Sequence, residues 1–200
     1  MEAAAVSMKT YKLVGNALHM CHGHCTALDV GSGIDGWGAA LLSLSLNARQ
    51  RTIALFDPHV AAGRTGPADP TIRVVHDPVA EVPQAQWINY AYVFSHIPEA
   101  HVRATVERFR AAYPKAVATV LDYTLRGRDE EEAFFLLTQT DAENAECVAM
   151  GGRAFLDQHM RFTLDDIADI LRHSGYGGIR TETLDSSGSR GFVLGLPSRD

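Results

Sequence analysis

Short apolar runs alternate with segments of helical periodicity along most of this 200-residue chain. A buried parallel strand reads as a continuous apolar run, whereas a covering helix repeats its apolar residues every three or four positions. The alternation therefore predicts an α/β protein with a mostly parallel sheet. The predicted strands lie near residues 27–30, 51–57, 71–75, 87–94 and 116–123.

Helices are predicted before the first of these strands, near residues 10–20, between strands, near 39–44 and 98–112, and after the last of them, from 164 up to Gly175. Pro98 suits the first turn of its helix, which buries Val102, Val106, Phe109 and Tyr113 on one face. Thr163 and Asp166 have the spacing of a capping box, and Gly175 supplies a left-handed stop. The chain then forms a terminal hairpin from runs near 178–184 and 190–196.

Two segments interrupt the regular alternation. Residues 61–70 contain too much glycine and proline to continue a helix. Between about 125 and 161, a charge run, a short apolar block and a Gly-Gly break predict two short helices near 129–138 and 141–150. An excursion of this length is more than a connection needs, so we expect a lid or an interface, for example of a homodimer.

Composition limits the partners. The length suits one α/β domain over residues 1–200, and the net charge of −6 disfavours a nucleic-acid substrate. The three cysteines are an odd number that suits reduced thiols in the cytoplasm, and neither an export signal nor a membrane span is expected. The segment Cys21 to Cys25 offers soft ligands, but five consecutive residues can hardly wrap a tetrahedral ion, so a connector is expected and no metal site.

A glycine-rich turn joins the first strand to the following helix and is the strongest chemical signal. Gly31-x-Gly33-x-x-Gly36, with Asp57 further along, matches the dinucleotide fingerprint. A dinucleotide would place its pyrophosphate over this turn, where Asp29 and Asp35 would oppose it. S-adenosylmethionine (SAM) has no phosphate and carries an ammonium and a sulfonium, so the charge of the turn favours SAM.

The run Asp29-x-Gly31-x-Gly33 resembles motif I of the class I, Rossmann-like, SAM-dependent methyltransferases, and the resemblance covers about residues 25–197. It implies a three-layer α/β sandwich with a seven-stranded, mostly parallel sheet, a C-terminal antiparallel hairpin, and SAM as cofactor. The chain departs from the motif where a third glycine is replaced by Asp35. The implied cofactor-binding residues are Asp29, Gly31, Ser32, Gly33, Asp35, Asp57, Pro58, Asp77 and Tyr90.

Two of these residues have a second interpretation. Asp57 follows the second strand, where the resemblance implies an acid that accepts hydrogen bonds from both ribose hydroxyls; it can instead cap a helix that starts at Pro58. Asp77 matches the place where these enzymes present an acid to the adenine amino group, but it can equally be a turn residue before a proline.

His96 follows the fourth strand and is the candidate catalytic base, because parallel strands meet ligands at their carboxyl ends. It can instead support the start of the next helix. The first hypothesis is methyl transfer from SAM to a small-molecule acceptor. The alternatives are the same fold using SAM to transfer or cyclise its aminocarboxypropyl arm, and a non-catalytic binding partner.

Overall fold

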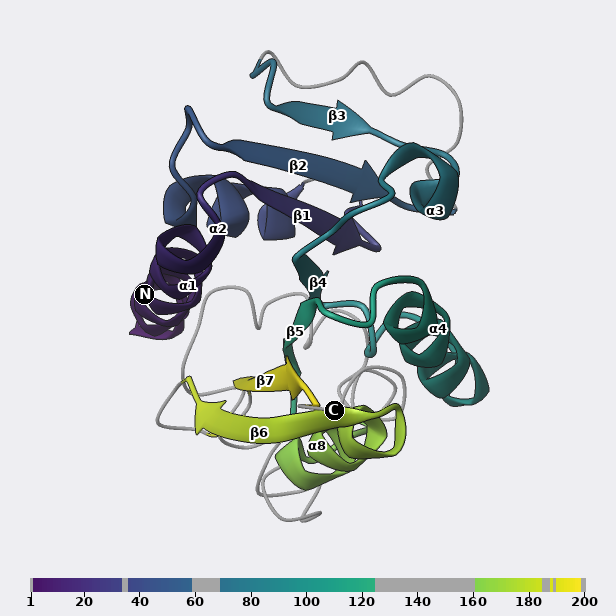
Figure 1. Ribbon diagram of the computed structural model, residues 1–200. Coiled ribbons are helices and arrows are strands. Elements are labelled where there is room, and N and C mark those ends of the chain that lie inside the picture. Colours follow the sequence, from purple (N-terminus) through teal and green to yellow (C-terminus); the bar gives the residue numbers. More distant parts are fainter. Residues whose placement is uncertain are drawn as a thin grey trace.

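The structure is a computed structural model, and it describes residues 2–33, 36–58, 69–124, 161–184, 188 and 190–198. Its helices and strands alternate through the first two thirds of the chain (Figure 1). The helices are α1 (Glu2–His22), α2 (Trp37–Ser45), α3 (Pro78–Glu81), α4 (Glu99–Ala112) and α8 (Leu164–His173). The strands are β1 (Cys25–Val30), β2 (Arg51–Phe56), β3 (Ile72–Val74), β4 (Trp87–Ala91), β5 (Val117–Tyr123), β6 (Tyr176–Thr183) and β7 (Arg190–Pro197).

One seven-stranded sheet has the order β3-β2-β1-β4-β5-β7-β6. The first five strands pair in parallel, and β7 enters antiparallel between β5 and β6. The chain reverses direction in the sheet after β3, because β1 lies between β2 and β4. Such a reversal separates the loops at the carboxyl ends of the neighbouring strands, which is where open α/β sheets bind ligands.

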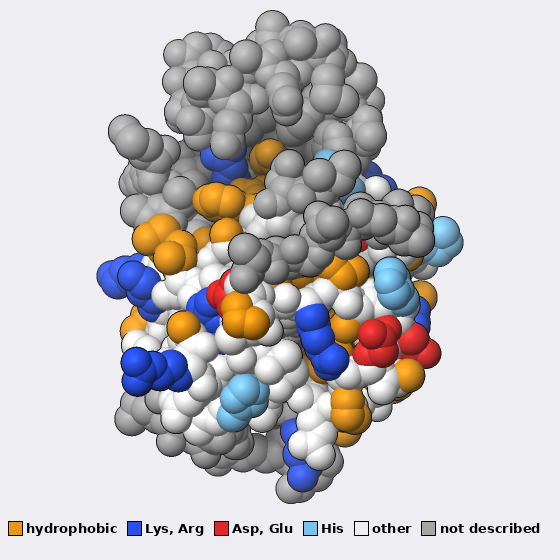
Figure 2. Space-filling model, turned by 90° about the horizontal axis from the view of Figure 1, so that it is seen from above, with side chains coloured by type: hydrophobic (Ala, Val, Ile, Leu, Met, Phe, Trp, Pro, Cys, Tyr) orange, Lys and Arg blue, Asp and Glu red, His pale blue; other side chains and the backbone are white. Residues whose placement is uncertain are grey.

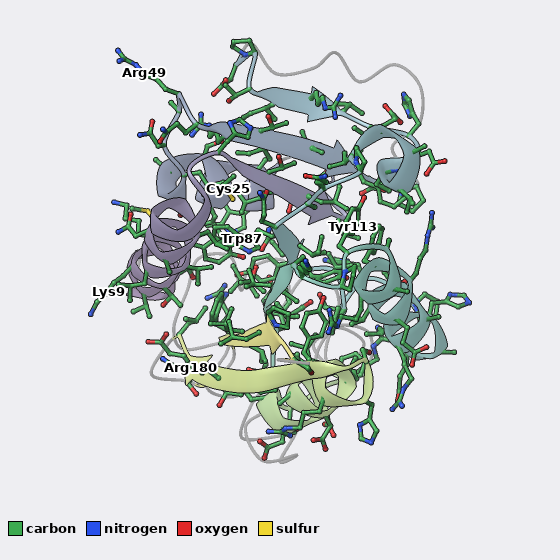
Figure 3. The ribbon with its side chains drawn as sticks, viewed as in Figure 1. Lys9, Cys25, Arg49, Trp87, Tyr113 and Arg180 are labelled. Atoms are coloured by element: carbon green, nitrogen blue, oxygen red, sulfur yellow. The ribbon has the colours of Figure 1, made fainter. Side chains whose placement is uncertain are left out.

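Helices cover both faces of the sheet, which gives the three layers that the sequence predicts (Figure 1). Alternate strand residues point to opposite faces, so each strand feeds two cores. In β4, Trp87 packs with α1 and α2, whereas Ile88 packs with α4 and α8. Figure 3 shows Trp87 in the interior beside α1, and its side chain is fully buried.

The sequence located most elements to within a few residues. Thr163 and Asp166 form the expected capping box, Gly175 adopts a positive φ of 89°, and the terminal hairpin is present. Two predictions were wrong in extent. Helix α1 begins eight residues earlier than expected, and β4 ends at Ala91 because Tyr92 turns the chain with a φ of 57°.

The predicted helices near 129–138 and 141–150 and most of the glycine- and proline-rich segment lie outside the described residues. None of the described helices is long and apolar enough to cross a bilayer. Helix α1 ends at His22, so only Gly23 and His24 separate it from β1, as expected of a connector.

Arg51 joins three elements at the amino-terminal edge of the sheet. Its side chain is 7% exposed, and its guanidinium pairs with Asp69 at 2.5 Å. It also donates to the hydroxyl of Thr71 at 3.1 Å and to the carbonyls of Ser43 and Leu46 near the end of α2. The arginine thus satisfies carbonyls that the end of a helix leaves without partners.

We therefore expect Arg51→Ala to lower the free energy of unfolding by about 2 kcal/mol or more, because it removes the ion pair to the half-buried Asp69 and the donor to two carbonyls. Urea denaturation measures the change. Arg49→Ala is the matched control, since Arg49 is exposed and points away from the body of the protein (Figure 3). Equal losses in the two variants would contradict this role of Arg51.

Candidate functional site

A cavity of about 500 Å³ opens at the carboxyl ends of β1, β2 and β4. Its walls come from the glycine turn after β1, the end of β2, the loop after β4 and one face of α4. The described lining residues are Val30, Gly31, Ser32, Gly33, Gly36, Trp37, Gly38, Phe56, Asp57, Pro58, Ala91, Tyr92, Val93, His96, Ile97, Thr105, Arg108 and Phe109.

The glycine turn is shaped by positive φ angles and by close packing. Gly31 has a φ of 68°, and a Cβ there would lie 2.8 Å from Cγ2 of Val93. Gly33 has a φ of 56°, and a Cβ there would meet no described atom within 4 Å. Any other residue would be strained at both positions. The turn therefore brings its backbone to the edge of the cavity and leaves space above it.

Hydrogen bonds tie this turn to the end of β2. The amides of Gly31 and Ser32 donate to the carbonyl of Phe56 at 2.7 and 3.2 Å. The amide of Gly33 donates to Oδ2 of Asp57 at 2.9 Å. Asp57 is partly buried, and it is the one acidic residue among the described residues that line the cavity. The sequence-predicted residues Gly31, Ser32, Gly33, Asp57 and Pro58 thus meet at one site.

Asp29 lies beneath the turn and does not line the cavity. The residue is 1% exposed, and its carboxylate accepts from the side-chain amide of Asn89 at 2.7 Å. The side-chain carbonyl of Asn89 accepts from the hydroxyl of Tyr11 in α1 at 2.5 Å and from the hydroxyl of Thr119 at 2.8 Å. The indole N–H of Trp87 donates to the same Thr119 hydroxyl at 2.7 Å. Burial and the nearby Asp29 charge raise the pKa of Tyr11 above its ordinary value. This buried network joins α1 to the strands below the turn.

Tyr90 and Asp77, which the sequence also predicted to bind the cofactor, are not among the described residues that line the cavity. Tyr90 is fully buried and packs against Phe94, with ring centroids 5.6 Å apart. Asp77 is exposed and caps α3, accepting from the amide of Ala80 at 3.4 Å. Asp35 lies outside the described residues. The alternative in which Asp57 caps a helix also falls on undescribed residues.

The loop after β4 places His96 at the cavity. Tyr92 has a left-handed φ of 57°, which is rare for an aromatic residue and is the kind of strain found at functional sites. Its ring packs on Tyr123 with centroids 5.0 Å apart. The chain then folds back through hydrogen bonds from the amides of His96 and Ile97 to the carbonyl of Val93, at 3.0 and 3.1 Å.

Two charged side chains hold this loop from behind. Asp122, at the end of β5, is 1% exposed and accepts from the amides of Phe94 at 2.7 Å and Ser95 at 3.3 Å. The guanidinium of Arg161 donates to the carbonyls of Phe94 and Ile97 at 2.9 and 2.6 Å. Burial raises the pKa of Asp122 to about 6, although its hydrogen bonds favour the ionised form.

Sequence reasoning missed the α4 wall of the cavity. It assigned Phe109 to the helix face that packs on the sheet, which is correct, since Phe109 is 1% exposed. Thr105 lies three positions before Arg108 and four before Phe109, which puts it on the same side of α4 as both, and Thr105 and Arg108 also line the cavity. No motif marks them. Trp37, at the start of α2, is 44% exposed at the same cavity.

The surface shown in Figure 2 carries its Lys and Arg side chains in separate groups, with hydrophobic, acidic and uncharged surface between them. On this face the described residues form no continuous basic surface of the kind that follows a phosphate backbone. Among the described residues, no three His, Cys, Asp or Glu side chains come together as a metal site would require.

No protein-family profile and no curated protein matches this sequence. Solved structures do match. The SAM-dependent methyltransferase SibL, in its apo form, is 15% identical with a TM-score of 0.60, over 96% of this chain and 57% of SibL. The chain spans only about half the length of several matches, between 47% and 57% of four solved chains.

Two matches were solved with S-adenosylhomocysteine (SAH). The Burkholderia thailandensis 1,6-didemethyltoxoflavin-N1-methyltransferase is 14% identical with a TM-score of 0.56, over 96% of this chain and 79% of the enzyme. The magnesium protoporphyrin IX methyltransferase of Synechocystis PCC 6803 is 12% identical with a TM-score of 0.56, over 98% of this chain and 86% of the enzyme. The chain therefore has the fold of the class I SAM-dependent methyltransferases, as the sequence predicts.

The raised pKa of Asp122 predicts a pH dependence of stability. Its folded pKa of about 6 lies above the ordinary value of an unfolded aspartate, so folding takes up a proton between about pH 4 and pH 6. As the pH rises from about 4 to about 6, the free energy of unfolding of the wild type should therefore fall relative to that of Asp122→Asn, by up to about 3 kcal/mol. Urea denaturation at several pH values measures the difference.

The matched control is Asp165→Asn, which removes an exposed carboxylate from α8. The free energy of unfolding of this variant should not increase relative to that of the wild type between pH 4 and pH 6. A difference between wild type and Asp122→Asn that stays constant with pH would contradict the account of Asp122.

Proposed function

We propose that this protein is a SAM-dependent methyltransferase that acts on a small-molecule acceptor. The observation that carries the proposal is the cavity at the carboxyl ends of β1, β2 and β4, where the glycine turn and Asp57 meet. Structures with the same fold and with SAH bound support it. In an open α/β sheet this edge is the expected ligand site.

The hydrogen bonding of the turn favours SAM over a dinucleotide. A pyrophosphate is held by backbone amides of such a turn. Here the amides of Gly31 and Ser32 donate to the carbonyl of Phe56, and the amide of Gly33 donates to Asp57. The antiparallel β7 differs from the parallel continuation of a dinucleotide-binding sheet.

The residues present fit SAM. The space above Gly33, where a Cβ would meet no described atom, leaves room for the ligand. The carboxylate of Asp57 suits ribose hydroxyls as hydrogen-bond donors, and its negative charge suits a cationic ligand. When bound, SAM supplies a methyl group on a positively charged sulfur. Asp29 contributes from below by fixing the strand that leads into the turn.

His96 is the residue we propose to move a proton. His96 is exposed and lines the cavity, and an imidazole can take a proton from a hydroxyl or ammonium acceptor near neutral pH. Asp122 and Arg161 fix the backbone on either side of it.

The segment 125–161, most of which lies outside the described residues, remains our candidate for a lid or an interface. We also propose that the protein acts in the cytoplasm.

Two alternatives use the same fold. The protein can transfer or cyclise the aminocarboxypropyl arm of SAM, which would release methylthioadenosine in place of SAH. It can also be a non-catalytic partner that binds no SAM. Mass spectrometry of the products after incubation with SAM and a panel of small nucleophiles separates the first alternative from methyl transfer, and a binding titration tests the second.

We expect Asp57→Ala to weaken SAM binding at least tenfold, because it removes charge-assisted hydrogen bonds to the ribose and the anchor of the Gly33 amide. Calorimetry gives the dissociation constant. Asp57→Asn keeps an oxygen for the Gly33 amide and should lose less affinity. Unchanged affinity in a folded Asp57→Ala protein would show that this carboxylate does not hold the cofactor.

Trp37 provides an independent report on the same cavity. It is 44% exposed there, whereas Trp87, the other tryptophan of the chain, is fully buried. Bound SAM should protect Trp37 fluorescence from iodide quenching, and Trp37→Phe should abolish the protected signal. Protection that persists in Trp37→Phe would place the ligand elsewhere.

Once an acceptor is found, His96→Ala should slow single-turnover methyl transfer by about 10²-fold. The variant's rate should also lose the change with pH, between pH 6 and 9, that comes from titration of an imidazole. The expected loss is limited because methyl transfer depends mainly on in-line positioning. A rate and pH profile equal to those of the wild type would leave His96 with a structural role and direct the search to Tyr123.

A further inference from the structure

Two aromatic rings that pack on each other line the end of the cavity where α4 meets β2. Phe109 of α4 packs edge-on against Phe56 at the end of β2, with ring centroids 5.9 Å apart and an interplanar angle of 69°. Both residues line the cavity, together with Thr105 one turn earlier on α4. Two aromatic rings and a hydroxyl at this end contrast with the glycine backbone at the other wall.

Arg108 lies beside the Phe109 ring on the same helix. It is exposed and lines the cavity, and its guanidinium carbon lies 5.5 Å from the centroid of the Phe109 ring. Within the described ranges it forms no hydrogen bond or ion pair. By contrast, Arg110 on the same helix donates to the carbonyls of Pro114 and Gly175.

We propose that Arg108 stacks its guanidinium on the purine ring of the nucleoside ligand, at the end of the cavity that Phe56 and Phe109 line. A guanidinium is planar and weakly hydrated, and it stacks well on aromatic faces. This inference rests on the proposed function, because it assumes that Asp57 holds the ribose. A base attached to that ribose reaches the end of β2, where Phe56 immediately precedes Asp57.

The position of Asp77 supports this assignment. Asp77 is the acid expected from the sequence to meet the adenine, but its carboxylate caps α3 and is not among the described residues that line the cavity. The base would then be recognised mainly through its flat face. Stacking is worth about tenfold in affinity and depends on the shape of the cation, so a lysine should not replace it.

The test measures the affinity of two probes for the full chain by calorimetry. SAH carries the purine, the ribose and an amino-acid arm, whereas 5′-methylthioadenosine lacks the carboxylate. Arg108→Ala should weaken both probes by the same factor, about tenfold, and Arg108→Lys should recover little of the loss. Arg103→Ala is the matched control on the exposed side of α4 and should bind both probes as the wild type does.

The outcomes separate the two proposals. A wild-type protein that binds neither probe overturns the proposed function, and this inference with it. A wild-type protein that binds SAH, with an Arg108→Ala variant of equal affinity, overturns this inference alone. A loss confined to SAH would mean that Arg108 pairs with the ligand carboxylate, which also overturns stacking on the purine. Thermal melts confirm that the variants are folded.

Discussion

The hydrogen bonds between the glycine turn and the end of β2 are the constraint on which the cavity depends. Three consecutive amides, from Gly31 to Gly33, donate to the Phe56 carbonyl and the Asp57 carboxylate. This arrangement commits these three amides to partners within the protein, and it fixes a carboxylate at the cavity wall. One set of contacts thereby determines both the shape of the turn and the charge of the ligand that suits it.

The opposite wall depends on charged groups behind the loop after β4. Asp122 takes two loop amides and Arg161 takes two loop carbonyls, so the backbone that carries His96 is held from both directions. The raised pKa of Asp122 shows that its burial opposes folding at neutral pH. A costly buried charge next to a strained Tyr92 is consistent with a loop whose position matters for function.

Much of the fold could be predicted from the sequence because it depends on local patterns. The apolar runs of the parallel strands, the Thr163 capping box and the glycine turn each have a short-range signal. The length of β4 could not be predicted, since its aromatic residues continue a strand pattern while Tyr92 adopts a left-handed turn. Only tertiary packing against Tyr123 and the constraints on the following loop distinguish the two conformations.

The meeting of Gly31, Gly33 and Asp57 at one cavity could be predicted, because a short motif marks the two glycines and Asp57 directly follows a strand. The contacts of a residue could not be predicted where its partner is distant in the sequence. Asn89, for example, lies sixty positions from the buried Asp29 to which it donates a hydrogen bond.

The central claim is that this cavity binds SAM through the glycine turn and Asp57. A crystal structure with SAH tests it most directly: we expect the ribose at Asp57 and the purine at Phe56 and Phe109, and a ligand bound elsewhere, or none at millimolar SAH, would contradict the account.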